Sequence, residues 1–193
     1  NQIRRGLIMT INNNFSDITY NRKSIRVYDE NVKISHEEML EMIQKATIAP
    51  SSVNMQPWRF VVVESPEEKQ KLKPLIRFNT RQNDTSSAMI LIFGDMECYE
   101  YGEAIYNQAV TEGKMSPEVR DQQLAAIIPY YKNFTRAQMN DVVKIDSSLA
   151  AMQLMLVARS HGYDTNPIGG FEADQLAEAF GLEKERYVPV MIL

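Results

Sequence analysis

The stretch TRAQMNDVVKIDSSLAAMQLMLVARSHG, residues 135–162, has the strongest helical pattern in the chain. Thr135 followed three residues later by Gln138 is a typical helix start, and Gly162 is a typical helix end. Between them, large apolar side chains recur at helical spacing at Val142, Ile145, Leu149, Met152 and Leu156. Small residues flank this row, so we expect a long buried helix at the centre of the fold, with the row facing the core.

Three short apolar runs outside this helix are typical of strands. Residues 60–63 (FVVV) are rich in β-branched side chains, and residues 89–93 (MILIF) repeat the pattern and stop at Gly94. Residues 187–193 (YVPVMIL) begin a last strand, and because they end in mid-pattern we infer that the natural protein continues. Residues 24–28 alternate polar and apolar side chains, which predicts one further strand.

Start signals predict several more helices around these strands. Ser35 with Glu38 forms a capping box for a helix ending near residue 50. Ser65 and Ser116 are each followed by proline, as at many helix starts. Shorter helices are expected at residues 16–22 and 172–180. The alternation of helices and strands, without a linker or repeat, predicts one α+β domain over residues 15–193. Residues 1–14 would be a flexible segment, and with a natural start at Met9 the first eight of them would lie upstream of it.

Composition excludes several classes of protein. A chain of 193 residues with 44% hydrophobic and 24% charged residues is neither disordered nor fibrous. Its formal net charge of -4 offers no basic field for nucleic acid. The single cysteine excludes a disulfide framework and favours a cytoplasmic setting. No uncharged apolar run is long enough for a membrane span, so we expect no membrane association.

The side chains that usually carry enzyme chemistry are sparse. His36 and His161 lack neighbours at metal-ligand spacing, and we expect both at the surface and no metal site. Cys98 has no adjacent base and is expected to be a structural thiol. The glycine motifs of common nucleotide-binding loops and hydrolases are absent. Acid, base or nucleophile chemistry by the protein itself therefore has little support.

Three segments nevertheless concentrate residues suited to a small-molecule site. Residues 22–26 (RKSIR) place two guanidinium groups around a hydroxyl, which suits an anion or, alternatively, a solvated basic turn. Residues 49–60 (APSSVNMQPWRF) form a polar, proline-stiffened connection, which suits a binding loop or a structural loop with Trp58 in the core. Residues 162–171 (GYDTNPIGGF) pair two glycines in a glycine-poor chain, which admits a ligand to the backbone or simply turns it.

Taken together, the patterns R-x-S-x-R, A-P-S-S-x-N-x-Q-P-W-x-F and P-x-G-G-F resemble the nitroreductase family of FMN enzymes, from about Phe15 to Leu193. The resemblance implies an α+β fold with a central, mostly antiparallel sheet surrounded by helices. It also implies an intertwined homodimer with two flavin sites at the interface. NADH or NADPH would reduce the FMN, which would pass hydride to a nitroaromatic, a quinone or a similar small-molecule acceptor in ping-pong fashion. The alternatives are a dehydrogenase or dehalogenase of the same superfamily and a non-enzymatic flavin-binding protein.

The resemblance assigns flavin contacts residue by residue, with no catalytic side chain apart from the flavin's own chemistry. From the first segment, phosphate and ribityl contacts would come from Arg22, Lys23 and Ser24. Arg26 would lie beside N1 and O2 of the ring, where a fixed cation stabilises the reduced flavin. The second subunit would contribute Pro50, Ser51, Ser52 and Asn54.

Two further groups complete the implied site. Amides for the ribityl or pyrimidine groups would come from Asn79 and Gln82. One ring face would be covered by Pro167, Ile168, Gly169 and Gly170, with a backbone N–H directed at N5. Some members have an acidic residue where Gly169 stands, which would change nicotinamide and substrate preference. The family's basic phosphate-binding residue after the last strand would lie beyond Leu193.

Overall fold

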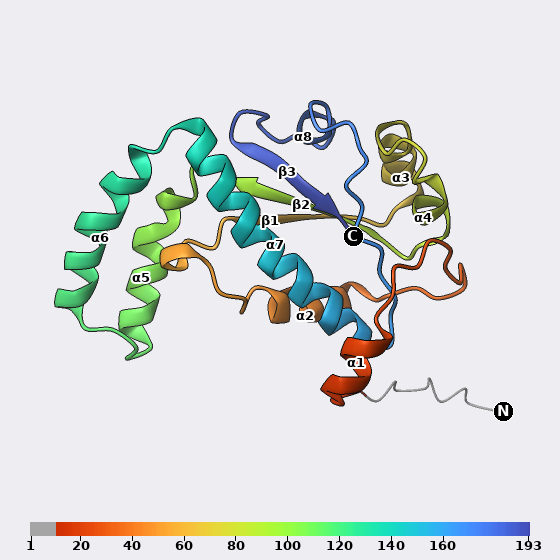
Figure 1. Cartoon of the computed structure of the whole chain (residues 1–193), viewed down its shortest axis with the longest axis horizontal. Helices are drawn as coiled ribbons and strands as arrows, with labels where there is room; N and C mark the ends of the chain where they lie inside the picture. The colour runs from red at the N-terminus through yellow and green to blue at the C-terminus, as the bar shows by residue number, and fades with distance from the viewer. Residues whose placement is uncertain (1–10) are drawn as a thin grey trace.

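The computed structural model describes residues 11–193 (Figure 1). Its centre is a three-stranded antiparallel sheet in the order β1-β2-β3, formed by β1 (Trp58–Val63), β2 (Met89–Asp95) and β3 (Tyr187–Ile192). Helices surround it, so the predicted α+β class with an antiparallel sheet is confirmed.

Side-chain alternation along β2 builds a core on each face of the sheet. Met89, Leu91 and Phe93 pack beneath α3 (Pro66–Leu72), the 3-10 turn η2 (Lys73–Leu75) and α8 (Leu176–Ala179). Ile90 and Ile92 pack on the other face, against α2 (His36–Ala46) and α7 (Arg136–Ser160). Every β2 residue is buried, as expected of a strand covered on both sides.

The long helix α7 presents a different side to the sheet from the one expected. Of the predicted core row, Ile145, Leu149 and Met152 are exposed at 63%, 44% and 40%. The buried side instead carries Val143, Leu154 and Met155 together with the small residues Ser147, Ala150, Ala151 and Ala158. Small side chains allow the helix backbone to approach the sheet closely, so the sheet takes this side and leaves the larger apolar row outward.

Gly94 marks the point where α7 crosses β2. The strand was expected to stop there, but it continues to Asp95, with Gly94 paired to Trp58 and Val188. A Cβ atom on Gly94 would lie 2.6 Å from Cγ2 of Val143. Glycine is therefore used here for close packing and not as a terminator.

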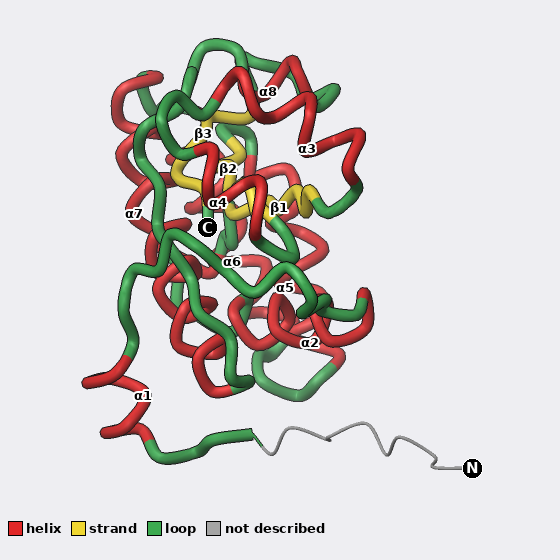
Figure 2. Tube along the Cα trace, turned by 90° about the vertical axis from the view of Figure 1, so that its right-hand side faces the viewer, coloured by secondary structure: helices red, strands yellow, loops and turns green. Residues whose placement is uncertain are grey.

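The remaining helices lie toward the two ends of α7. Near its start, α5 (Gly102–Thr111) and α6 (Pro117–Lys132) form a hairpin preceded by the 3-10 turn η3 (Cys98–Tyr101). Near its end, α1 (Phe15–Asn21) contacts α7, and the backbone N–H of Asn12 donates to the carbonyl of Ser160 at 2.8 Å. Figure 2 shows α1 at one end of the molecule and α3 and α8 at the other. The segment that includes α4 (Thr80–Thr85) connects α3 to β2.

Local helix signals were largely accurate. The side chains of Ser35, Ser65 and Ser116 cap α2, α3 and α6. Thr135 and Gln138 form the complete capping box of α7. The helix predicted at residues 172–180 is shorter, since only Leu176–Ala179 is α-helical and a turn precedes it.

The prediction that His161 lies at the surface is wrong. Its ring lies 3.1 Å from Oε1 of Glu38 and 3.0 Å from Nζ of Lys45, and the residue is buried. Glu38 also accepts from the hydroxyl of Tyr163 at 2.7 Å, so its carboxylate joins α2 to the residues that follow α7. The same carboxylate therefore does not complete the capping box that was expected at the start of α2.

Cys98 is a buried free thiol, as predicted. Within residues 11–193, no helix combines the length and apolar character needed to span a membrane.

Candidate functional site

The first and third singled-out segments lie side by side. The N–H of Ile25 donates to the carbonyl of Thr165 at 3.0 Å, and Ser24 pairs with Thr165 in an isolated parallel bridge. The strand expected at residues 24–28 is limited to this bridge, because within residues 11–193 no second strand lies beside Arg26 and Val27. Residues 22–34, here called the N-terminal strap, therefore meet the 162–168 segment at Ser24 and Ile25. Farther along the strap, the N–H groups of Tyr28 and Ile34 donate to the hydroxyls of Thr85 and Ser87.

The strap carries a cluster of cations on its outer side. Lys23, Ser24 and Arg26 are exposed and Arg22 is half-buried. Within residues 11–193, none of the three basic side chains forms an ion pair. Cations gathered beside a hydroxyl and left without carboxylate partners fit an anionic group such as a phosphate.

Asn79 and Gln82 join the same region from α4 and the residue preceding it. The amide of Asn79 donates to the carbonyl of Gly170 at 2.9 Å and accepts from Gln82 at 3.3 Å. Both amides are buried. This contact sets the position of Gly170, while at Gly169 a Cβ atom would have no heavy-atom neighbour within 4 Å. In the described part of the chain, the backbone N–H of Gly169 has no acceptor, and bare backbone with a free donor fits a flat ligand ring.

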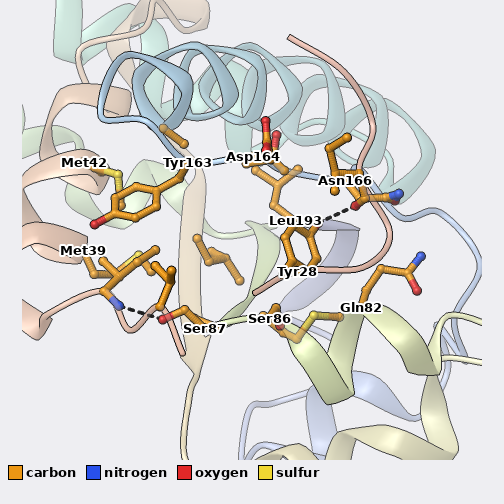
Figure 3. Close-up of a pocket in the computed structure, with 18 of the residues that line it drawn as sticks. Tyr28, Met39, Met42, Gln82, Ser86, Ser87, Tyr163, Asp164, Asn166 and Leu193 are labelled. Atoms are coloured by element: carbon orange, nitrogen blue, oxygen red, sulfur yellow. Dashed lines mark hydrogen bonds between the residues drawn. The ribbon is translucent and has the colours of Figure 1, made fainter. Parts of the chain in front are cut away.

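A cavity of about 310 Å³ lies beneath the strap (Figure 3). Tyr28 lies across it between Asn166 and Ser86, and burial raises the pKa of Tyr28 to about 12, so the phenol stays protonated and donates to Ile25. Among the predicted flavin contacts, only Gln82 and Ile168 line this cavity. The side chains that line the cavity include Ile25 but none of the strap's cations, so the cationic cluster lies outside it.

Two buried hydroxyls at this cavity have no hydrogen-bond partner. Oγ of Ser86 and Oγ1 of Thr165 are both enclosed and unpaired within residues 11–193. Unpaired buried hydroxyls are costly and are typical of sites where a partner arrives from outside the described atoms. Sequence reasoning missed both, because a single Ser or Thr in a loop has no distinguishing pattern.

The second segment lies at the other end of α7. The N–H and hydroxyl of Ser52 donate to the carboxylate of Asp146 at 3.0 and 3.2 Å. Asp146 precedes Ser160 by 14 residues, or about 21 Å of helix rise. Figure 1 shows the same separation, with η1 (Ser52–Asn54) beside α5 and α6 and far from α1 and α4. One chain therefore does not bring Pro50, Ser51, Ser52 and Asn54 to the strap.

Trp58 and Pro167 belong to the second and third segments. Trp58 is 4% exposed and packs with Ala49 and Ala150. It therefore belongs to the core, as expected if residues 49–60 were a structural loop. Pro167 is exposed beside the buried Ile168, which pairs with Ile192 of β3. The sheet edge thus supports the 167–170 backbone that the family pattern places over a ring.

Comparisons with known proteins agree with this geometry. The sequence model described as "Nitroreductase family" matches residues 19–193. A Bacillus subtilis (strain 168) protein, YdgI, provisionally named an NAD(P)H nitroreductase, is 54% identical over 94% of this chain and 87% of its own length. A CLA biosynthesis enone reductase from Lactiplantibacillus plantarum is 41% identical over 94% of this chain and 84% of its own length.

A solved structure supports the same assignment. A provisionally named nitroreductase from Exiguobacterium sibiricum 255-15, crystallised in complex with FMN, superposes with a TM-score of 0.92. It is 56% identical, and the match covers 95% of this chain and 88% of that one. The expected fold and resemblance are therefore confirmed: the chain belongs to the nitroreductase family.

Proposed function

We propose that this chain, over residues 15–193, is an FMN-binding subunit of an oxidoreductase that passes hydride from NADH or NADPH to a small acceptor. The observation that carries the proposal is the contact of the cationic strap with Thr165, in the segment that leads to the open backbone of Gly169. The names of the relatives, nitroreductase and enone reductase, support the reaction class. The buried free thiol of Cys98 fits a cytoplasmic setting.

The residues present fit FMN as an anionic, planar ligand. Arg22, Lys23 and Ser24 would hold its phosphate and ribityl chain, and Arg26 would face the pyrimidine side of the ring. When bound, FMN supplies the two-electron hydride chemistry that these side chains lack. The free N–H of Gly169 would hold N5 by a hydrogen bond, with Asn79 fixing the neighbouring Gly170. Arg26 would stabilise the negative charge that accumulates on the reduced ring.

We also propose a homodimer formed through the exposed apolar row of α7, which comprises Ile145, Leu149 and Met152. Ile48 is 79% exposed, and the 45–52 connection that carries it contacts α7 through Gln153 and Asp146, which extends the apolar surface. Exposed apolar surface of this kind is typical of protein interfaces. A dimer would also bring the second segment of one subunit to the strap of the other.

Flavin content and turnover test the proposed activity. Purified protein should be yellow, bleach with NADH or NADPH, and regain colour with a nitroaromatic, a quinone or an α,β-unsaturated ketone. Arg26→Ala should slow flavin reduction by about tenfold, whereas Lys184→Ala, at an exposed turn, should not change it. Protein that takes up no added FMN would refute the proposal. The acceptor panel separates a nitroreductase from a dehydrogenase, a dehalogenase or an enone reductase.

The oligomeric state has its own test. Leu149→Asp places a charge in the apolar row and should shift the protein from dimer to monomer in sedimentation experiments. The control Gln70→Asp changes an exposed residue of α3, on the far face of the sheet, and should leave the dimer unchanged. A Leu149→Asp protein that sediments like the wild type would argue against this interface.

A further inference from the structure

The loop at residues 51–56, here called the anchored loop, has an unusual backbone. Val53, Asn54 and Gln56 have φ values of 44°, 57° and 46°, in the left-handed region that non-glycine residues rarely adopt. For the β-branched Val53 this conformation is especially unfavourable. A cluster of strained residues persists only where surrounding contacts determine it, and such clusters are typical of functional sites.

Polar groups from three helices hold this loop. Asp146 of α7 accepts from both the N–H and the hydroxyl of Ser52, at 3.0 and 3.2 Å. From α5, the hydroxyl of Tyr106 donates to the carbonyl of Val53 at 2.9 Å, and from α6 that of Tyr131 donates to the carbonyl of Ser52 at 3.4 Å. Consecutive peptide units are thus fixed from separate directions.

These anchors bind the backbone and leave the outer side chains free. Ser52, Val53 and Asn54 remain exposed, although Asp146, Tyr106 and Tyr131 behind them are buried. Asp146 is 2% exposed, and burial raises the pKa of its carboxyl group. Apolar packing would hold an ordinary loop without this desolvation cost. We therefore infer that the buried polar anchors hold the exposed side chains of the loop in a defined position.

We propose that Asp146, Tyr106 and Tyr131 are positioning residues that shape the anchored loop for the flavin site of the partner subunit. Through the two tyrosines, the α5–α6 hairpin is coupled to that flavin. This inference rests on the proposed FMN-binding dimer. It adds residues that neither touch the strap nor belong to the three sequence segments.

Conservative variants test the proposal through flavin binding and spectroscopy. Asp146→Ala removes both acceptors of Ser52 and should raise the Kd for FMN at least about tenfold and alter the visible circular dichroism of bound flavin. Asp146→Asn keeps one acceptor and should recover part of the affinity. Tyr106→Phe removes one hydroxyl and should raise Kd by about threefold to tenfold, which keeps the proposal testable if Asp146→Ala does not fold.

Matched controls remove an equivalent group without touching the loop. Asp141→Ala changes an exposed carboxylate on the same helix, and Tyr130→Phe removes an exposed hydroxyl beside Tyr131. Both should retain wild-type FMN affinity and spectrum. In the FMN-free protein, amide hydrogen exchange at residues 52–56 should accelerate in Asp146→Ala and not in Asp141→Ala. Unchanged exchange, affinity and spectrum in Asp146→Ala and Tyr106→Phe would overturn the proposal.

Mixed dimers determine which site the loop serves. Arg26→Ala in one subunit and Asp146→Ala in the other leave one intact flavin site if the loop acts across the interface. Both changes in the same subunit, paired with a wild-type subunit, then damage both sites. If the dimer with the changes in different subunits lost both sites and the dimer with both changes in one subunit kept one, the loop would not act on the flavin site of the partner. A wild-type protein that binds no FMN would refute the proposed function itself, whereas normal wild-type binding with unaffected variants would refute only the positioning role.

Discussion

Replacing Gly94 by alanine should loosen the contact between β2 and α7. The added Cβ would lie 2.6 Å from Cγ2 and 2.8 Å from Cβ of Val143. Ordinary carbon contacts are about 3.5–4.0 Å. Rotating the Val143 side chain cannot relieve the second contact, because Cβ is attached directly to the helix backbone. The helix or the strand must therefore shift by about 1 Å.

Overpacking of this kind typically costs about 1–3 kcal/mol. For a chain of this size, each kcal/mol corresponds to about 2–4 °C, so the unfolding midpoint should fall by about 2–12 °C. Differential scanning calorimetry at one fixed subunit concentration measures this shift, since oligomers unfold in a concentration-dependent way. Adding Val143→Ala removes the 2.6 Å contact and keeps the 2.8 Å one. The double variant should therefore be more stable than the sum of the single effects by about 1 kcal/mol.

Gly169→Ala is the matched control, because its Cβ would meet no heavy atom within 4 Å. Its effect on the stability of the FMN-free protein should stay within about 0.5 kcal/mol. If Gly94→Ala were as stable as this control, or if its effect and that of Val143→Ala simply added, close packing at the crossing would not explain the glycine.

Three further outcomes follow from other contacts. Burial raises the pKa of Cys98 to about 12, so a thiol reagent at neutral or mildly alkaline pH should label the native protein slowly and the unfolded protein fully; rapid native labelling would contradict its burial. Tyr163→Phe removes a donor to Glu38 and should lower the free energy of unfolding by about 0.5–1.5 kcal/mol, while Tyr20→Phe, at an 86% exposed position, should not. Thr135→Ala removes the N-cap of α7 and should cost about 0.5–2 kcal/mol in urea titrations; a variant as stable as wild type would show the cap to be dispensable.

Signals that act within a few residues were sufficient to locate most elements. Thr135 caps the helix that follows it regardless of what packs nearby, and the run at residues 89–93 forms a strand because both faces are apolar. The family pattern likewise predicted flavin contacts in the strap and in the 167–170 backbone, and these stay predictions. These features depend on side-chain chemistry at short range, which the order of residues states directly.

Which of the two apolar sides of α7 packs on the sheet was decided only by the tertiary structure. The row at Ile145 and the row at Val143 are both apolar, and the sheet selected the second because Gly94 allows a close approach there. The spacing pattern identified α7 as a helix but did not determine which side would be buried.

Polar contacts between residues far apart in the chain could not be predicted from the sequence either. His161 is buried because Glu38, 123 residues away, supplies a hydrogen-bond partner. Asp146 was not recognised because its partner, Ser52, lies 94 residues earlier. The sequence by itself determined the elements, the class of fold and the residue types of the candidate site. Only the tertiary structure decided which helix side is buried and which carboxylate holds which loop, because packing and desolvation depend on neighbours that are distant in the chain.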